Sequence, residues 1–397
     1  MDEAFIIDAV RSASGRGKVG GAFACTHPVD LLAQVVSSLI RRTGIDPVGV
    51  DDVIGGCVTQ AGEQAMNVTR QAILAAGLPE RVPATTVDRQ CGSSQQAVHF
   101  AAQAVRSGAC DVVIACGVES MSRARMWTNW LDRDPYGPAF ARRYPGGLVP
   151  QGIAAELVAS RGGLTRKDLD AFAAQSHERA ARAWGSGWFD AEVVPVEATA
   201  ADGRTRTVRA DETVRAGTSV AQLAGLRPAF HDESLGGRFP EIRWQITAGN
   251  SSPLTDGAAA ALIASESATR RLYLEPRARV AGMSVVGDDP LTMLTAVLPA
   301  TEMVLARAGM TVGDVDLFEI NEAFACVPLV WQREFSVPDE RLNMAGGAIA
   351  LGHPLGASGI RILATLLGNL ERTGSRVGLQ TMCEAGGMAN ALLVERL

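Results

Sequence analysis

Two kinds of apolar pattern alternate along the first 120 residues. Runs rich in β-branched and other apolar residues predict strands, and they lie at 5–10, 51–58 and 111–118. Runs with apolar residues at helical spacing lie at 30–44, 67–78 and 94–108. Alternating strands and helices are typical of α/β proteins with central sheets.

The C-terminal third repeats this layout. The stretch 315–325 resembles 51–59 in its pattern, and a helical run at 357–374 followed by a strand-like run at 377–384 echoes 94–108 followed by 111–120. Two copies of one layout predict a core of two pseudo-duplicated halves.

Between the halves, at about 122–247, the amino-acid composition changes. Aromatic residues, arginines, prolines and glycines crowd 122–152, and a charged tract covers 201–218. Such a segment is expected to be loop-rich and exposed, with helices at 152–163 and 166–187 as its framework. We therefore expect an N-terminal half at 1–121 to which 248–271 returns, an inserted region at 122–247 and a C-terminal half at 272–397.

Composition limits the class of protein. The chain has 397 residues, 47% of them hydrophobic and 20% charged, which suits a globular enzyme with more than one domain. The formal net charge of −6 argues against a nucleic-acid-binding surface. No apolar run approaches the ~20 residues of a membrane span, so no membrane partner is expected.

The cysteines indicate a reducing compartment. Seven are scattered along the chain without a CxxC pair, which predicts neither a disulfide framework nor a metal site. The N-terminus is acidic and enters a strand-like run at once, unlike a signal peptide. We expect a cytoplasmic protein.

One motif is rejected. Gly15, Gly17 and Gly20 spell GxGxxG after a strand, but the next helix begins only near Pro28, too late to place its N-terminus under a pyrophosphate. The sequence therefore predicts no dinucleotide cofactor.

Three residues carry candidate chemistry. Cys91 lies between a predicted strand at 83–90 and a helix, where free N–H groups and the positive helix end favour a thiolate. His353 and Cys383 lie in glycine-rich loops. Each has a plainer interpretation, since an isolated cysteine is often a small buried hydrophobe and Cys383 fits a tight turn. Together they suggest covalent acyl chemistry.

Six segments in this order resemble the thiolases, the acyl-CoA acyltransferases that make or cleave 3-ketoacyl-CoA. They are DAVRSASGR, DRQCGSSQQA, TAGNSSPLTDGAAAAL, NEAFA, GGAIALGHPLGASG and CEAGGMANALLVERL. The resemblance covers nearly the whole chain. It implies a five-layered α/β/α/β/α sandwich in which the inserted region is a loop domain that covers the active site and binds coenzyme A. The sequence around Cys91 most resembles that of thiolases that degrade bulky acyl-CoA substrates.

The resemblance also implies roles for single residues. Cys91 would carry the acyl group, His353 would accept the proton of Cys91, and Cys383 would exchange a proton with the substrate α-carbon. Asn321, through a water, and His353 would form one oxyanion hole, and the backbone N–H groups of Cys91 and Ala385 a second.

Contacts with coenzyme A are implied for Ser252, Ala248 and Leu226, although Ser252 also suits a cap or turn. Acyl-CoA and coenzyme A are substrates, no bound cofactor or metal is implied, and the protein is expected to be a homodimer or homotetramer.

Three segments depart from the family pattern. Pro150-Gln151-Gly152 stands in place of His-Met-Gly, so the histidine and methionine are absent. Met344 and Ala345 replace a polar pair, and Ala385 replaces a glycine. Two other functions therefore stay open: a thiol-dependent acyl-CoA hydrolase, which would not need Cys383, and a catalytically impaired acyl-CoA or lipid-binding protein, for which Ala385 is the reason.

Overall fold

A computed structural model describes residues 3–397, and a single mixed sheet runs through it. The sheet order is β11-β12-β13-β10-β1-β9-β5-β3-β4, with β2 (Gly15–Arg16) beside β9 and β6 (Val193–Val194) beside β1. The N-terminal strands are β1 (Ala4–Ser12), β3 (Asp52–Gly56), β4 (Ala84–Val87), β5 (Val112–Ser120) and β9 (Thr255–Ser265). The C-terminal strands are β10 (Ala278–Gly287), β11 (Leu317–Ile320), β12 (Val377–Glu384) and β13 (Met388–Arg396).

The sheet consists of two copies of one arrangement, as the repeated pattern predicts. The order β3-β5-β9-β1 corresponds to β11-β12-β13-β10, and the parallel and antiparallel pairings correspond too. The copies join through β1 and β10, which pair only at Phe5↔Arg279 and Ile6↔Ala278. Two sheets of the expected sandwich are thus continuous at one edge.

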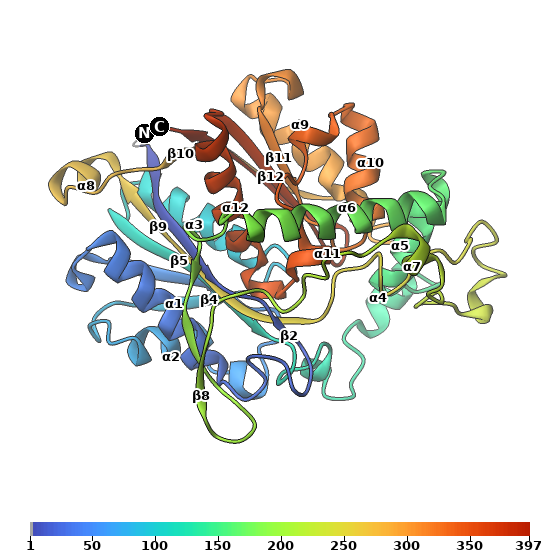
Figure 1. The fold of residues 1–397 in the computed structure, drawn as a ribbon, viewed down its shortest axis with the longest axis horizontal. Helices are drawn as coiled ribbons and strands as arrows, with labels where there is room; N and C mark the ends of the chain where they lie inside the picture. Colours follow the sequence, from blue (N-terminus) through green and yellow to red (C-terminus); the bar gives the residue numbers. More distant parts are fainter. Residues whose placement is uncertain (1–2) are drawn as a thin grey trace.

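Helices form the other three layers (Figure 1). One outer layer is α1 (Pro28–Thr43) and α2 (Val68–Ala75), and the other is α9 (Val297–Ala308) and α10 (Cys326–Phe335). Between the two halves lie α3 (Ser93–Arg106) and α12 (Ser358–Thr373), which contact each other and both halves of the sheet. The five-layered α/β/α/β/α architecture is confirmed.

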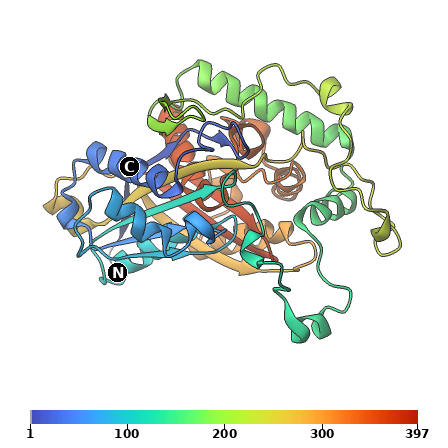
Figure 2. The same ribbon diagram turned by 90° about the horizontal axis from the view of Figure 1, so that it is seen from below.

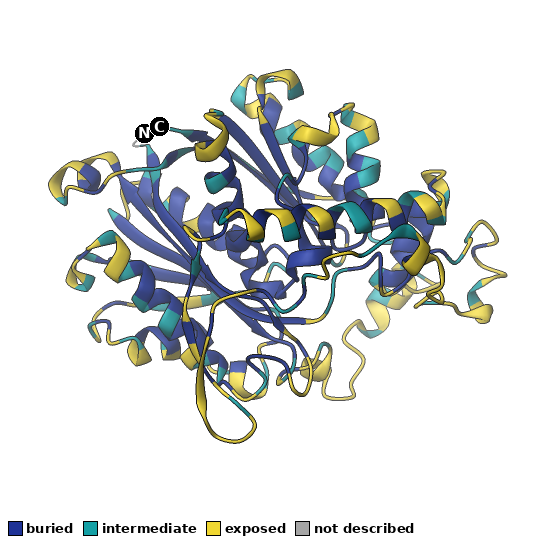
Figure 3. Cartoon of the chain, viewed as in Figure 1, coloured by how far each residue is buried: buried dark blue, intermediate teal, exposed yellow. Residues whose placement is uncertain are grey.

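The central layer is almost completely buried (Figure 3). Apolar residues of α3 and α12 share one core with the facing strands. The two helices approach closely at Gly359, where an added Cβ would lie 2.3 Å from the backbone nitrogen of Gln95. The helix layer is therefore too tightly packed at this point for a larger residue.

The inserted region covers one side of the sandwich (Figure 2). Its elements are α4 (Gly137–Arg143), α5 (Gln151–Arg161), α6 (Arg166–Gly185), a hairpin of β7 (Val196–Thr199) and β8 (Thr205–Val208), and α7 (Val220–Ala224). The expected helices at 152–163 and 166–187 correspond to α5 and α6. A capping box of Thr165 and Asp168 begins α6. Two further short helices, α8 (Glu266–Arg271) and α11 (Ala348–Leu351), lie outside the inserted region.

Within residues 3–397, no helix combines the length and the hydropathy needed to cross a bilayer.

Candidate active site

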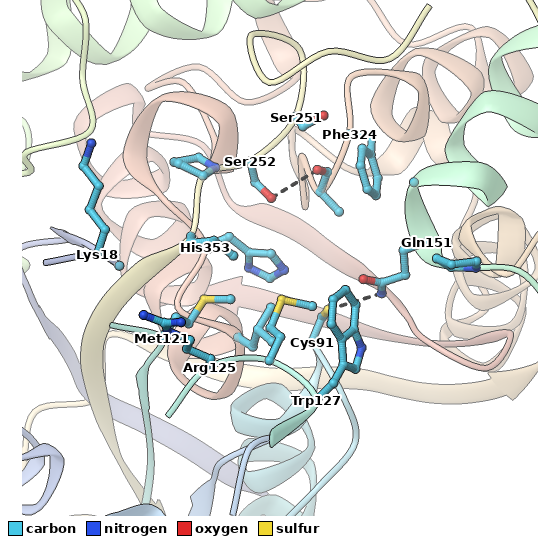
Figure 4. A pocket seen from close by; sticks show the side chains of 18 of the residues that line it. Lys18, Cys91, Met121, Arg125, Trp127, Gln151, Ser251, Ser252, Phe324 and His353 are labelled. Carbon is cyan, nitrogen blue, oxygen red and sulfur yellow. Dashed lines mark hydrogen bonds between the residues drawn. The ribbon is translucent and has the colours of Figure 1, made fainter. Parts of the chain in front are cut away.

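A cavity of about 840 Å³ lies where both halves meet the inserted region. Apolar side chains dominate its wall, and polar groups are few (Figure 4). The lining comprises Gly17, Lys18, Val19, Cys91, Met121, Ser122, Arg125, Met126, Trp127, Pro150, Gln151, Gly152, Phe230, Ser251, Ser252, Pro253, Leu254, Ala323, Phe324, His353 and Leu355. Such a size and lining are typical of a small-molecule site.

Cys91 lies at the start of α3, as the sequence predicts. Gly92 is the N-cap of α3, and Gln90 takes a left-handed conformation with φ 48° in the turn before it. Asn390 of β13 donates a hydrogen bond of 3.0 Å to the Gly92 carbonyl, which fixes this turn on the C-terminal half. The Cys91 side chain therefore faces the cavity from a rigid support (Figure 4).

The protonation state of Cys91 differs from the sequence-based expectation of a favoured thiolate. Burial raises the pKa of the Cys91 thiol to about 12, and Glu384 and Glu119 add to this effect, while a hydrogen bond from Gln151 and the Cys91 N–H oppose it. The cost of placing a charge in this apolar site exceeds the benefit of the helix N-terminus. The thiol form predominates in the free protein, so a base must take its proton during reaction.

His353 can serve as that base. It is 3% exposed, and burial together with Arg361 lowers its pKa to about 3, so the imidazole is neutral at pH 7. Ser358 Oγ donates to the Pro354 carbonyl at 2.8 Å and lies 2.6 Å from His353 Nδ1. Because the single hydroxyl proton is used on Pro354, Nδ1 is the protonated nitrogen and Nε2 carries the free lone pair.

Asn321 and Cys383 lie behind the cavity wall. The Asn321 amide nitrogen is 3.4 Å from His353 Nε2, and its buried Oδ1 has no partner among the described residues. Cys383, near the end of β12, is 1% exposed, and burial and the neighbouring Cys91 raise its pKa well above the usual value. The structure therefore gathers Cys91, His353, Asn321 and Cys383 around one place.

Ala385 follows β12 directly and packs against the C-terminal core. Its φ is not positive, whereas Gly386 and Gly387 have φ 85° and 79°. The neighbouring glycines, not Ala385, take the unusual dihedrals, so the alanine methyl causes no backbone strain.

Of the three residues expected to contact coenzyme A, one lines the cavity and two lie outside its lining, with Leu226 packed beside Gly249. Ser252 lines the cavity and donates a hydrogen bond of 3.1 Å to the Ala323 carbonyl. Ala248 and Leu226 are exposed and lie outside this lining. Lys18 and Arg125, which the sequence did not single out, supply cationic side chains to it.

Two further polar residues lie at the site without a role predicted from the sequence. Gln151 of the inserted region points its amide at Cys91 Sγ, with Nε2 4.0 Å away. Glu119, at the end of β5, is fully buried and holds the loop after His353 through the Gly356 N–H at 2.9 Å. The available signal for Glu119 was a lone Glu in an apolar strand. For Gln151 it was the departure from the family pattern at 150–152, which does not reveal the contact with Cys91.

Comparison with known proteins assigns the family. The family model for the thiolase N-terminal domain matches residues 4–267, and that for the thiolase C-terminal domain matches 274–396. The chain is 45% identical to the steroid 3-ketoacyl-CoA thiolase FadA6 of Mycobacterium tuberculosis, over 100% of this chain and 95% of that protein. It is 43% identical to a 3-ketoacyl-CoA thiolase of Erwinia tasmaniensis, over 100% of both.

A solved structure agrees with these relatives. The crystal structure of the Bacillus anthracis acetyl-CoA acetyltransferase has a TM-score of 0.89 and 35% identity, and the match covers 100% of this chain and 99% of that one. The fold and the relatives define an acyl-CoA acyltransferase. The chain belongs to the thiolase family.

Proposed function

We propose that this thiolase transfers acyl groups between Cys91 and coenzyme A, in thiolysis of 3-ketoacyl-CoA or in the reverse condensation. The observation that carries the proposal is the placement of a thiol and a neutral imidazole on one cavity, with a second thiol directly behind them. A hydrolase would not need the second thiol, and a binding protein would need neither.

In thiolysis, Cys91 gives its proton to His353 Nε2, and its sulfur attacks the 3-keto carbonyl. The bond between C2 and C3 breaks, the acyl group stays on Cys91, and the acetyl-CoA carbanion takes the proton of Cys383. Coenzyme A then loses its thiol proton to Cys383 and attacks the acyl-cysteine. Cys91 leaves as a thiolate and recovers its proton from His353, so the enzyme is restored.

Charge develops on oxygen twice in this sequence. The backbone N–H groups of Cys91 and Ala385 would donate to the oxyanion on the carbon bonded to Cys91, and His353 with a water held by Asn321 would donate to the enolate oxygen of acetyl-CoA. The unpartnered Oδ1 of Asn321 suits such a water.

We assign coenzyme A to the space between the inserted region and the N-terminal half. Ser252 would contact the pantetheine arm, with Ala248 and Leu226 further out, and Lys18 and Arg125 suit the phosphates. The apolar wall and a relative named for steroid substrates support a large apolar acyl group. No bound cofactor is needed, and seven free cysteines fit a reducing cytoplasm.

We also propose a homodimer or a dimer of dimers. Strand β4 ends the sheet and leaves one row of backbone groups without a partner strand among the described residues. Three exposed apolar side chains, Met66, Leu74 and Phe100, lie on or beside the helices that pack against this strand. A second copy of β4 would complete the sheet.

The test follows loss of the 3-keto thioester on incubation with acetoacetyl-CoA or a ring-bearing 3-ketoacyl-CoA plus coenzyme A. Intact mass should show one acyl adduct, absent in Cys91→Ala and retained in Cys25→Ala, the exposed control cysteine. Release of free acid would indicate a hydrolase, and tight binding without turnover a binding protein.

A further inference from the structure

Gln151 places a neutral hydrogen-bond donor against the reactive sulfur. It is the first residue of α5, partly exposed, and its Nε2 lies 4.0 Å from Cys91 Sγ across the cavity (Figure 4). The two residues are 60 positions apart and come from different parts of the fold, the inserted region and the start of α3. The contact therefore depends on how the inserted region packs over the N-terminal half.

The groups around Cys91 determine whether a negative charge on its sulfur is stabilised. Cys91 is 4% exposed, and the ionisable groups around it are Glu384 and Cys383 on β12, Glu119 on β5 and His353 before α12. Lys18 and Arg125 line the same cavity, but neither is among the groups that shift the Cys91 pKa. In the resting site, neither carboxyl group nor the neutral imidazole favours a negative sulfur, whereas the amide of Gln151 and the Cys91 N–H do. Once His353 holds the Cys91 proton, its charge also favours the thiolate, and the Gln151 amide adds to that effect.

We propose that Gln151 is a further catalytic residue, whose amide N–H donates to the Cys91 sulfur and stabilises it whenever it carries negative charge. This inference rests on the proposed role of Cys91 as the acyl carrier. Sulfur is negative twice in the cycle, before attack on the substrate and when it leaves to coenzyme A, so both acylation and deacylation would use the same donor. The Gln151 position is also one of those at which this chain departs from the family pattern.

The test is a charge series at this position. Gln151→Lys, Gln151→Met and Gln151→Glu place a cation, an apolar group of similar size and an anion near the sulfur. The rate of Cys91 alkylation by iodoacetamide reports the thiolate fraction and is measured from pH 6 to 10. We expect the order Lys, Gln, Met, Glu from fast to slow, with Met about tenfold slower than wild type. Because the Cys91 pKa lies above this pH range, rates are compared at each pH, and Met should stay slower throughout. The kcat for thiolysis should fall, with KM for coenzyme A little changed.

Leu254→Met is the matched control, because Leu254 lines the same cavity and has no assigned role. It should alkylate within twofold of wild type. Equal rates and equal pH profiles in wild type and Gln151→Met would overturn the inference while leaving Cys91 as the acyl carrier. Peptide mass mapping separates the two cases. Alkylation of the exposed Cys25 is expected in every variant, whereas acylation of a cysteine other than Cys91 in wild type would contradict the proposed function instead.

Discussion

At the residue scale, burial rather than helix position decides the resting state of the nucleophile. Cys91 occupies a helix N-terminus, yet its pKa is raised to about 12 because the site is dry. A protonated thiol is less exposed to alkylation and oxidation between turnovers, and its activation depends on partners around the cavity.

Ser358 is expected to matter through His353 alone. Its hydroxyl holds the Nδ1–H tautomer, and Ser358→Ala removes that acceptor without altering the cavity wall. We expect acylation of Cys91 to slow about five- to tenfold, the equivalent of one buried hydrogen bond. Single-turnover mass spectrometry measures this rate, and Ser267→Ala, on exposed α8, serves as control. An unchanged rate would show that the tautomer needs no fixing.

Ala385→Gly should change turnover by only a few-fold. The φ of Ala385 is already outside the positive region, so the alanine keeps the N–H available at no conformational cost. A hundred-fold gain in kcat would correspond to recovery of a whole oxyanion-hole donor, ~2.7 kcal/mol, and would revive the interpretation of an impaired enzyme.

The residues that sequence reasoning found and missed differ in a physical way. Cys91 and His353 could be found because the residues next to them in the sequence predict their local settings. Cys91 precedes a helix, and His353 lies in a glycine-rich loop. The Gln151 contact depends on tertiary packing across 60 positions. The raised pKa of Cys91 depends on how much water the whole cavity admits, which no local pattern encodes.

At the scale of elements, Glu119 ties two loops, the one between β3 and α2 and the one between α11 and α12, to the end of β5. Its carboxylate accepts hydrogen bonds from the N–H groups of Val58, Thr59 and Gly356 and from the side chain of Gln64, at 2.9–3.0 Å. The loop of Gly356 begins with His353, so the position of the base depends on this carboxylate.

Glu119→Gln should therefore be costly. An amide offers one oxygen and turns two N–H donors toward a site that needs acceptors only, so we expect a loss of roughly 2–4 kcal/mol of unfolding free energy. Urea denaturation measures this loss. Glu63→Gln, an exposed partner of Arg123, should cost under ~1 kcal/mol. Equal midpoints for the two variants would contradict the role of Glu119.

Regular elements were more predictable than their assembly. Periodicity located α1, α3 and α6 because one face of each packs on a core. Helix α5 is buried on all sides over 152–159, so its position followed from its apolar helix-forming residues instead. It could not show that β1 and β10 join the two halves into one sheet, since only two residue pairs make that junction and neither has a local signature.

At the scale of the whole molecule, His99 links stability to pH. It lies fully buried in α3, neither ring nitrogen has a partner among residues 3–397, and burial lowers its pKa to about 3. Below pH ~6.5, His99 of the unfolded chain binds a proton, whereas His99 of the folded protein stays neutral until about pH 3. The free energy of unfolding therefore falls as pH falls from ~6.5 to about 3.

His99→Leu should remove that share of the acid sensitivity. Between pH 6.5 and 4, we expect the slope of unfolding free energy against pH to fall by up to ~1.4 kcal/mol per unit, with stability at pH 7 retained or increased. Urea unfolding at several pH values gives the slope. His231→Leu, at an exposed histidine, should keep the wild-type slope. If both variants keep it, His99 is not the source.

Thr85→Arg tests the proposed assembly. Thr85 is exposed on β4, and a charge there would oppose pairing with a second copy of that strand. Sedimentation should show a shift toward monomer, whereas Thr205→Arg on the exposed β8 hairpin should leave the mass unchanged. A wild-type protein that sediments as a monomer would contradict the proposed dimer.

The position of β9 has a consequence for synthesis on the ribosome. This strand pairs with β1 on one side and β5 on the other, yet it is translated only after the inserted region, more than 130 residues after β5 ends. Until residue 265 has left the ribosome, β9 is missing from the nascent N-terminal half. The edges of β1 and β5 that pair with β9 then have no partner strand. Nascent chains that stall within the inserted region are therefore the ones that should most need a chaperone.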